Sequence, residues 1–296
     1  MIHRTELRPA PLGQVRVEGG FWGQRREINR RRTLVSQHEQ LEQTGRLDGV
    51  DPTFKPGDRT AHHIFWDSDI AKWMEAVAYS LTTHPDAELA ARLEDAVSRF
   101  ARLQRPDGYV NSWFTAVEPE RRWSNLRDCH ELYCAGHLIE AAVAHFGATG
   151  KRHFLEVMGR YADYIGSVFG RGPGQRRGYP GHEEIELALV KLHQATGQAR
   201  HLDLARYFID ERGQQPYYYD QEAEVRGDAR RGGYDYCQAH RPVREQDRAV
   251  GHAVRAMYLY AGMADIARAD RDEGLIRAGL RLWENVCLRQ LYVTGS

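Results

Sequence analysis

The feature that most constrains the fold is a recurring unit of two helical segments joined by a tight turn. Apolar residues recur at helical spacing within each segment, and turns such as Gly-Ala-Thr-Gly at 147–150 separate the two segments. No run of strands lies between the helices, so the pattern predicts an all-α fold rather than a doubly wound sheet. The four units are 64–81 with 87–104, 129–146 with 153–169, 183–196 with 200–211, and 246–267 with 272–290.

The loops indicate how these hairpins are arranged. Turns within a hairpin are short, whereas the connections between hairpins are long and polar, so the long loops fall on one side of the assembly. An open α-solenoid and a closed toroid are both built from such units, and this asymmetry favours the toroid. In a toroid the first helices line a central cleft, and their starts converge at its mouth. A helical segment at 21–45 and an extended arm at 1–20 precede the hairpins.

Composition excludes several classes of partner. Lys plus Arg and Asp plus Glu both number 41 among the 296 residues, so no net charge attracts nucleic acid or an anionic membrane. No apolar run is long enough to cross a bilayer and no secretory signal begins the chain, so we expect a cytoplasmic protein. The cysteines lack the spacing of a zinc site, and no metal site is expected among them. They are Cys129, Cys134, Cys237 and Cys287.

Polar residues gather at the starts of the first helices, where an apolar stripe would be normal. The densest group is 128–137, in which His130, Tyr133, Cys134 and His137 share one helical stripe. His182 and His252 stand at equivalent helix starts, each directly after a glycine. One such histidine alone is readily explained as a helix cap. Three together suit the hydroxyl groups of a sugar, because a neutral imidazole both donates and accepts hydrogen bonds.

The acidic residues at the same helix starts do not identify a catalytic pair. Asp67, Asp69 and Glu184 lie in or next to first turns, where the helix dipole stabilises a carboxylate by about 0.3–1 kcal/mol. Capping and substrate contact both stay open for them. Glycoside cleavage normally uses two carboxylates that flank one bond, and no such pair stands out in the sequence. We therefore assign no catalytic residue.

Five stretches together resemble the β-L-arabinofuranosidase family of glycoside hydrolases, over nearly the whole chain and in the same order. They are 65–69 (Phe-Trp-Asp-Ser-Asp) with Lys72-Trp73, 106–109 (Pro-Asp-Gly-Tyr), 130–142, 181–189 and 251–255 (Gly-His-Ala-Val-Arg). The resemblance implies an (α/α)6 barrel and a retaining hydrolase that releases terminal β-L-arabinofuranose from plant-derived glycans. It also implies that His130, His182 and His252 contact the sugar.

The resemblance further implies groups that this sequence does not match. The family's nucleophile is a zinc-bound cysteine thiolate, held with one Glu and further Cys ligands, and a separate Glu is the general acid/base. The segment 291–295 resembles the one that precedes these groups, and none of the four cysteines occupies a matching position. We expect zinc in the complete family enzyme but no metal in this chain, and residues 21–296 as a partial barrel of about four hairpins plus an N-terminal helix, truncated before its remaining helices.

Three functional interpretations stay open. The leading one is the sugar-binding portion of a β-L-arabinofuranosidase, a fragment of a longer gene product that is inactive alone and poorly soluble or oligomeric. The second is a non-catalytic helical toroid that binds sugar or serves as a scaffold. The third is another (α/α)6 enzyme, such as an unsaturated-uronyl hydrolase or a sugar epimerase, with its acid/base among the helices present. The expected partner is a carbohydrate, a terminal arabinofuranosyl glycan in the leading case. The linkage, the aglycone and the oligomeric state are not determined by the sequence.

Overall fold

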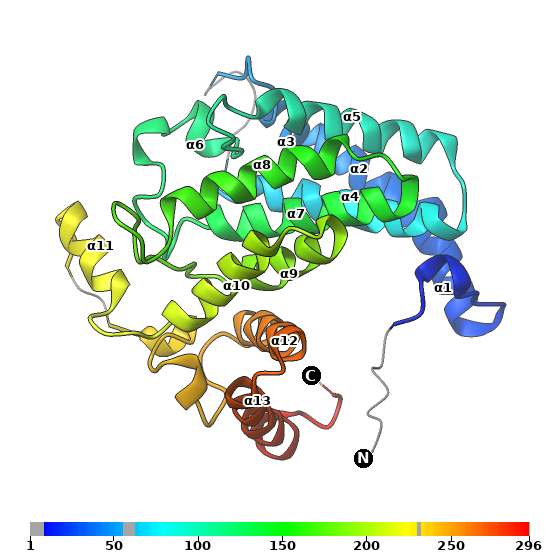
Figure 1. The fold of residues 1–296 in the computed structure, drawn as a ribbon. Coiled ribbons are helices and arrows are strands. Elements are labelled where there is room, and N and C mark those ends of the chain that lie inside the picture. Colours follow the sequence, from blue (N-terminus) through cyan, green and yellow to red (C-terminus); the bar gives the residue numbers. More distant parts are fainter. Residues whose placement is uncertain (1–8, 56–62, 230–231, 296) are drawn as a thin grey trace.

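The chain folds into a curved succession of helix hairpins, shown in Figure 1 by a computed structural model that describes residues 9–55, 63–229 and 232–295. Within these residues the extended pairing is limited to one isolated bridge between Phe169 and Arg176. The expected fold class, an all-α toroid of helix hairpins, is confirmed. The four hairpins are α4 (Trp66–Thr83) with α5 (Ala87–Leu103), α7 (Glu131–Thr149) with α8 (His153–Val168), α9 (Ile185–Thr196) with α10 (Ala199–Glu211), and α12 (Ala253–Asp270) with α13 (Glu273–Asn285).

The first helices of the hairpins form the inner layer. Helix α4 packs against α7, α7 against α9, and α9 against α12. Helix α7 is buried on nearly all sides, from Glu131 to His145. The outer helices bury one stripe only, as in α5, where Leu89, Leu93, Val97 and Phe100 face inward. The core therefore lies between the two layers, and the starts of the inner helices are left to form a site.

The predicted turns end and begin the helices as their residue types require. Asp86 caps α5, since its carboxylate accepts hydrogen bonds from the backbone N–H groups of Glu88 and Leu89 at 3.1 Å. Gly150 and Gly197 follow α7 and α9 in the left-handed conformation, with φ of 71° and 72°. These local signals explain why the hairpins could be located from the sequence.

Three details of the prediction are wrong. Helix α12 begins at Ala253 rather than at residue 246, because Gln246 is buried in the preceding loop, where its side-chain amide donates to the carbonyls of Gln238 and Arg241. Helix α7 begins at Glu131 rather than at Cys129. The polar stretch 213–245 contains a helix that the sequence did not reveal, α11 (Tyr218–Arg226), whose composition offers no apolar stripe.

The N-terminal region covers one side of the inner layer. The predicted helical segment at 21–45 is present as consecutive helices, and the indole N–H of Trp73 on α4 donates to the carbonyl of Leu34 at 2.9 Å. Residues 1–8 of the expected arm lie outside the described residues, and the division at residue 20 stays a prediction. The remaining helical segments are η1 (Leu12–Gln14), α1 (Gly20–Ile28), η2 (Asn29–Thr33), α2 (Leu34–Gln43), α3 (Arg46–Gly49), α6 (Trp113–Ala116), η3 (Pro119–Arg121), η4 (Tyr234–Cys237), η5 (Val243–Glu245) and η6 (Val286–Gln290).

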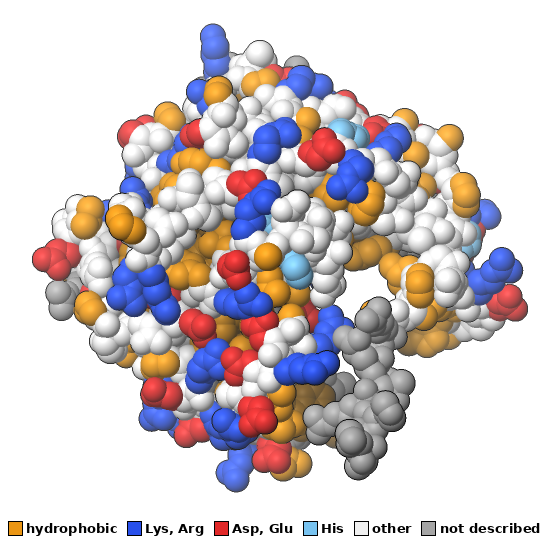
Figure 2. Space-filling model, in the orientation of Figure 1, with side chains coloured by type: hydrophobic (Ala, Val, Ile, Leu, Met, Phe, Trp, Pro, Cys, Tyr) orange, Lys and Arg blue, Asp and Glu red, His pale blue; other side chains and the backbone are white. Residues whose placement is uncertain are grey.

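Charged side chains of both signs lie on the outer surface (Figure 2). On the face shown in Figure 2, basic and acidic side chains are interspersed, in keeping with their equal numbers in the sequence. Large apolar side chains are exposed at the two ends of the chain of hairpins, as with Trp22 on α1 and Trp283 on α13. Among the helices of the described residues, none has the length and apolar character that crossing a membrane requires.

Candidate functional site

The three histidines singled out from the sequence lie together at the starts of three inner helices. His130 is the N-cap residue of α7, His252 is the N-cap residue of α12, and His182 lies just before α9. The ring centroids of His130 and His182 are 5.8 Å apart, and those of His182 and His252 are 5.9 Å apart. The long loops therefore bring residues separated by more than a hundred positions into one row.

The hydrogen bonds of these histidines fix which ring nitrogen carries the proton in the neutral form. Nδ1 of His130 lies 2.7 Å from the carbonyl of Asp128, and Nδ1 of His182 lies 2.8 Å from the carbonyl of Glu183. A carbonyl can only accept, so each Nδ1 donates and each Nε2 is left as an acceptor. His252 is the opposite case, since its Nδ1 accepts from the backbone N–H of Arg255 at 3.4 Å, which makes Nε2 a donor.

Burial keeps the first two histidines neutral near pH 7. Desolvation lowers the pKa of His130 below its ordinary value. The same effect lowers the pKa of His182 to about 3. The row thus presents two neutral acceptors beside one donor, a combination that matches vicinal hydroxyl groups, each of which donates and accepts.

Two tyrosines form a wall beside the histidines. The ring centroid of Tyr133 lies 4.3 Å from that of His182, and the ring centroid of Tyr258 lies 5.8 Å from it. Lys72 donates a hydrogen bond from its ammonium group to the hydroxyl of Tyr133 at 2.6 Å. The sequence did not mark Tyr258 as a site residue. Its place less than two turns after His252, on the inner helix α12, is the signal that could have found it.

Two buried arginines hold the segment that carries His182. The guanidinium group of Arg212 is fully buried, donates to the carbonyl of Pro180 at 2.9 Å and pairs with Glu186 at 3.0 Å. Arg255 donates to the carbonyl of Gly181 at 2.9 Å. Gly181 itself passes so close to Arg127 that an added Cβ would lie 1.9 Å from the carbonyl oxygen of that residue. His182 is therefore positioned by a rigid, buried support.

A second support lies beneath His130. This histidine has a φ of 57°, an unfavourable left-handed conformation for a residue with a side chain. The adjacent carboxyl group of Glu131 is buried and accepts hydrogen bonds from the hydroxyl of Tyr109 at 2.6 Å and the backbone N–H of Trp123 at 2.7 Å. Desolvation raises the pKa of Glu131 to about 8. This network anchors the start of α7 and fixes the direction in which His130 projects.

The aspartates at the start of α4 have structural partners. The buried carboxylate of Asp67 accepts hydrogen bonds from the backbone N–H and the hydroxyl of Ser112. Asp69 pairs with Arg46 at 2.9 Å. The sequence left capping and substrate contact open for both residues, and these partners indicate a third role, the anchoring of neighbouring segments.

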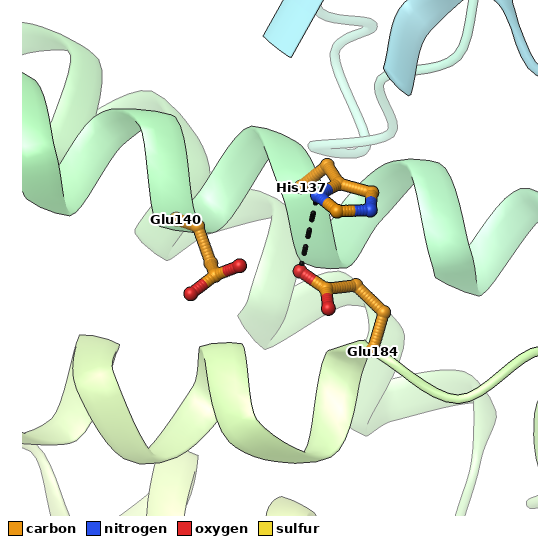
Figure 3. Close-up of side chains that lie close together, drawn as sticks. All are labelled: His137, Glu140 and Glu184. Carbon is orange, nitrogen blue, oxygen red and sulfur yellow. Dashed lines mark ion pairs between the residues drawn. The ribbon is translucent and has the colours of Figure 1, made fainter. Parts of the chain in front are cut away.

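Glu184 belongs to a different group, drawn in Figure 3, which adjoins Tyr133 and Tyr258 through His137. It consists of His137, Glu140 and Glu184, all buried, with ligand atoms within 4.8 Å of one another. The ring centroid of His137 lies 4.5 Å from that of Tyr133. Desolvation lowers the pKa of His137 to about 2, and desolvation together with Glu140 raises the pKa of Glu184 well above its usual range. The sequence placed His137 on a polar stripe but did not reveal its partner Glu184, the residue that precedes α9.

The cysteines do not fit the zinc-thiolate centre that the family resemblance implies. The thiol of Cys134 contacts the carbonyl of Ile64, whereas the thiol of Cys237 contacts Arg255. Desolvation raises the pKa of Cys129 to about 11 and that of Cys134 well above its ordinary value, which disfavours the thiolate that binds metal and attacks substrates. We therefore assign no reaction step to these cysteines.

Comparisons with known proteins identify relatives of the chain in both sequence and fold. The sequence model of the family described as beta-L-arabinofuranosidase, GH127 catalytic domain, matches residues 14–296. Over 243 residues the chain is 44% identical to the non-reducing end beta-L-arabinofuranosidase of Bifidobacterium longum subsp. longum, covering 79% of this chain and 37% of that protein.

Two solved structures are also similar. The crystal structure of Ara127N-Se, a GH127 beta-L-arabinofuranosidase from Geobacillus stearothermophilus T6, has a TM-score of 0.92 at 51% identity, over 95% of this chain and 46% of that one. The GH127 beta-arabinofuranosidase BT3674 has a TM-score of 0.85 at 38% identity, over 97% of this chain and 44% of that one. The chain thus spans less than half the length of these relatives.

Proposed function

The chain belongs to the GH127 β-L-arabinofuranosidase family, and from that premise we propose that His130, His182 and His252 bind a terminal β-L-arabinofuranosyl residue of a glycan. The observation that carries the proposal is the row of three imidazoles about 6 Å apart, in which two Nε2 atoms accept and one donates. A furanose ring with its hydroxyl groups has the size and the alternating hydrogen-bonding character to meet such a row.

The surrounding residues support sugar binding physically. Tyr133 and Tyr258 offer flat apolar faces for the C–H edges of a sugar ring, while the imidazoles receive its hydroxyl groups. Arg212 and Arg255 hold His182 in advance of binding, so little side-chain freedom is lost when the sugar arrives. Such preorganisation favours selectivity between ring forms of the same sugar.

We propose that these residues bind and orient the sugar, and that they do not by themselves break the glycosidic bond. Burial raises the pKa of Cys129, Cys134 and Cys237 and so disfavours their thiolates. Two of the buried carboxyl groups at this mouth are engaged in support, Glu131 by Tyr109 and Glu186 by Arg212. The arabinofuranosidase activity stated in the names of the relatives is therefore proposed only for a longer protein that contains this chain. The cytoplasmic location expected from the sequence stays a prediction.

The experiment that tests this function compares binding and turnover on the same preparation of the 296-residue chain. We expect ligand-observed NMR to show that an aryl β-L-arabinofuranoside binds to the chain and that a Δ4,5-unsaturated uronide binds far more weakly. With Zn2+ and a thiol reductant added, no aryl group should be released. Preferential binding of the uronide would favour the alternative (α/α)6 chemistry, and steady turnover of the arabinofuranoside would contradict the division between binding and cleavage.

A further inference from the structure

The group formed by His137, Glu140 and Glu184 is distinct from the histidine row, although it adjoins it: His137 follows His130 by seven residues, and Glu184 follows His182 by two. His137 and Glu140 project from α7, and Glu184 precedes the first residue of α9. Figure 3 shows that the three side chains converge between α7 and the start of α9. The nitrogen and oxygen atoms that they offer lie within 4.8 Å of one another.

The backbone forces Glu184 into this position. Gly136 on α7 approaches so closely that an added Cβ would lie 2.5 Å from Cγ of Glu184 and 2.9 Å from the backbone nitrogen of Ile185. Helix α7 therefore provides a cradle for the Glu184 side chain. The carboxylate is directed at the imidazole of His137, with Oε1 3.3 Å from Nδ1.

These groups are buried without the hydrogen bonds that burial normally demands. The side chain of His137 is 3% exposed and that of Glu184 is 0% exposed. Among the described residues, neither nitrogen of His137 and neither carboxylate oxygen of Glu184 has a hydrogen-bond partner. Buried polar groups are almost always satisfied by a partner. A bound ion would supply a partner for one ring nitrogen of His137 and for the carboxylate of Glu184 together.

The surrounding charges are negative in balance. The adjoining cavity, of about 600 Å³, is lined by the carboxyl groups of Glu75, Glu140 and Asp265 and by one ammonium group, that of Lys191. Lys191 donates a hydrogen bond to Oε1 of Glu140. One cation among several carboxylates leaves room for a second.

We propose that His137, Glu140 and Glu184 bind one divalent first-row transition cation of the Zn2+ or Mn2+ type. An imidazole nitrogen with two carboxylate oxygens suits such ions, whereas Ca2+ and Mg2+ prefer oxygen ligands alone. The ion would tie α7 to the start of α9, two residues after His182. The site contains no cysteine, so it is distinct from a zinc-thiolate centre, and it does not depend on the proposed function.

The test uses the wild-type 296-residue chain, stripped of metal and titrated with Co2+ and Zn2+. We expect one equivalent by elemental analysis, with Co2+ giving d–d absorption but no thiolate charge-transfer band. Glu184→Gln and His137→Gln should each lower the affinity for the ion at least tenfold. Glu94→Gln is the matched control, because Glu94 pairs with the buried His145 at 2.9 Å on the outer side of α7 and should leave binding unchanged.

Several results would overturn the proposal. If the wild-type chain binds no more Co2+ than Glu184→Gln, the side chains of His137 and Glu184 share a proton instead of binding an ion. A thiolate band, or binding that survives both substitutions, would place the ion elsewhere. Circular dichroism checks that each variant retains its helices; if one does not, Glu140→Gln replaces it, and the wild-type stoichiometry is decisive in either case.

Discussion

At the scale of single residues, the site depends on side chains whose protonation is set by burial. His182 is neutral because desolvation lowers its pKa, and Glu131 is protonated near neutrality because desolvation raises its pKa. Two of the three histidines in the row, His130 and His182, thus carry no charge near pH 7. Neutral groups leave hydrogen-bond geometry, rather than charge, to select the ligand.

Glu131 gives a pH dependence of stability that can be measured. Its folded-state pKa is about 8 against an ordinary value of 4.5, so between these pH values the folded chain binds more protons than the unfolded chain. Stability contributed at low pH is therefore lost as the pH rises through this window, by roughly 1 kcal/mol for each unit crossed. Urea unfolding from pH 5 to 8 should show a steeper loss for wild type than for Glu131→Gln, and parallel curves would contradict this account.

The sequence identified the residues that lie at helix starts but not their partners. His130, His182 and His252 could be placed together because a toroid brings helix starts to one mouth. The pairing of Asp67 with Ser112 spans 45 positions, and that of Glu184 with His137 joins two hairpins, so no local pattern marks either. Such contacts are set by tertiary packing, which is why the roles of these carboxylates stayed open.

At the scale of elements, the close approach of α7 and α9 positions both the histidine row and the cluster of His137, Glu140 and Glu184. Gly136 permits this approach, and Gly136→Ala should destabilise the chain by about 1–3 kcal/mol through overpacking against Glu184. Gly147→Ala is the control on the same helix, since an added Cβ there meets no atom of the described residues within 4 Å. Alanine also favours the helix over glycine by up to about 1 kcal/mol. Thermal unfolding, followed by circular dichroism, should show a lower midpoint for Gly136→Ala and not for Gly147→Ala.

Equal effects of the two substitutions would indicate that helix propensity, and not the contact between α7 and α9, sets the response.

The hairpins themselves were predictable, because apolar stripes and turn residues are local signals, as Asp86 and Gly150 illustrate. Helix α11 was not predictable from such signals. Its stability comes from contacts of Tyr219 and Glu222 with other segments, including hydrogen bonds from Leu126 and Arg127 to Glu222.

At the scale of the whole molecule, apolar side chains are exposed where the chain of hairpins ends. Leu280 and Trp283 on α13 are 58% and 68% exposed, beside an apolar groove of about 610 Å³ between α12 and α13. Exposed apolar patches of this kind promote association. We expect the 296-residue chain to form concentration-dependent oligomers in analytical ultracentrifugation. Leu280→Lys with Trp283→Glu should reduce them, and Val225→Glu on α11 should not.

A monomer at every concentration would contradict that expectation and would mean that the exposed side chains rearrange in solution.

The toroidal arrangement could be inferred from the order of short turns and long loops. The exposed edge could not be assigned in detail, because it depends on which faces of α12 and α13 remain unpacked. Local sequence patterns report that a face is apolar, and only the packed structure shows what covers it.

The central claim is that the row of His130, His182 and His252 binds an arabinofuranosyl group, and calorimetric titration with methyl β-L-arabinofuranoside tests it most directly. Each imidazole contributes about one hydrogen bond, worth roughly 0.5–1.5 kcal/mol, so His182→Ala and His252→Ala should each weaken binding about 3- to 10-fold. His201→Ala, a buried histidine on the outer helix α10, should leave the affinity unchanged. Equal affinity of all four proteins for the sugar would contradict the account.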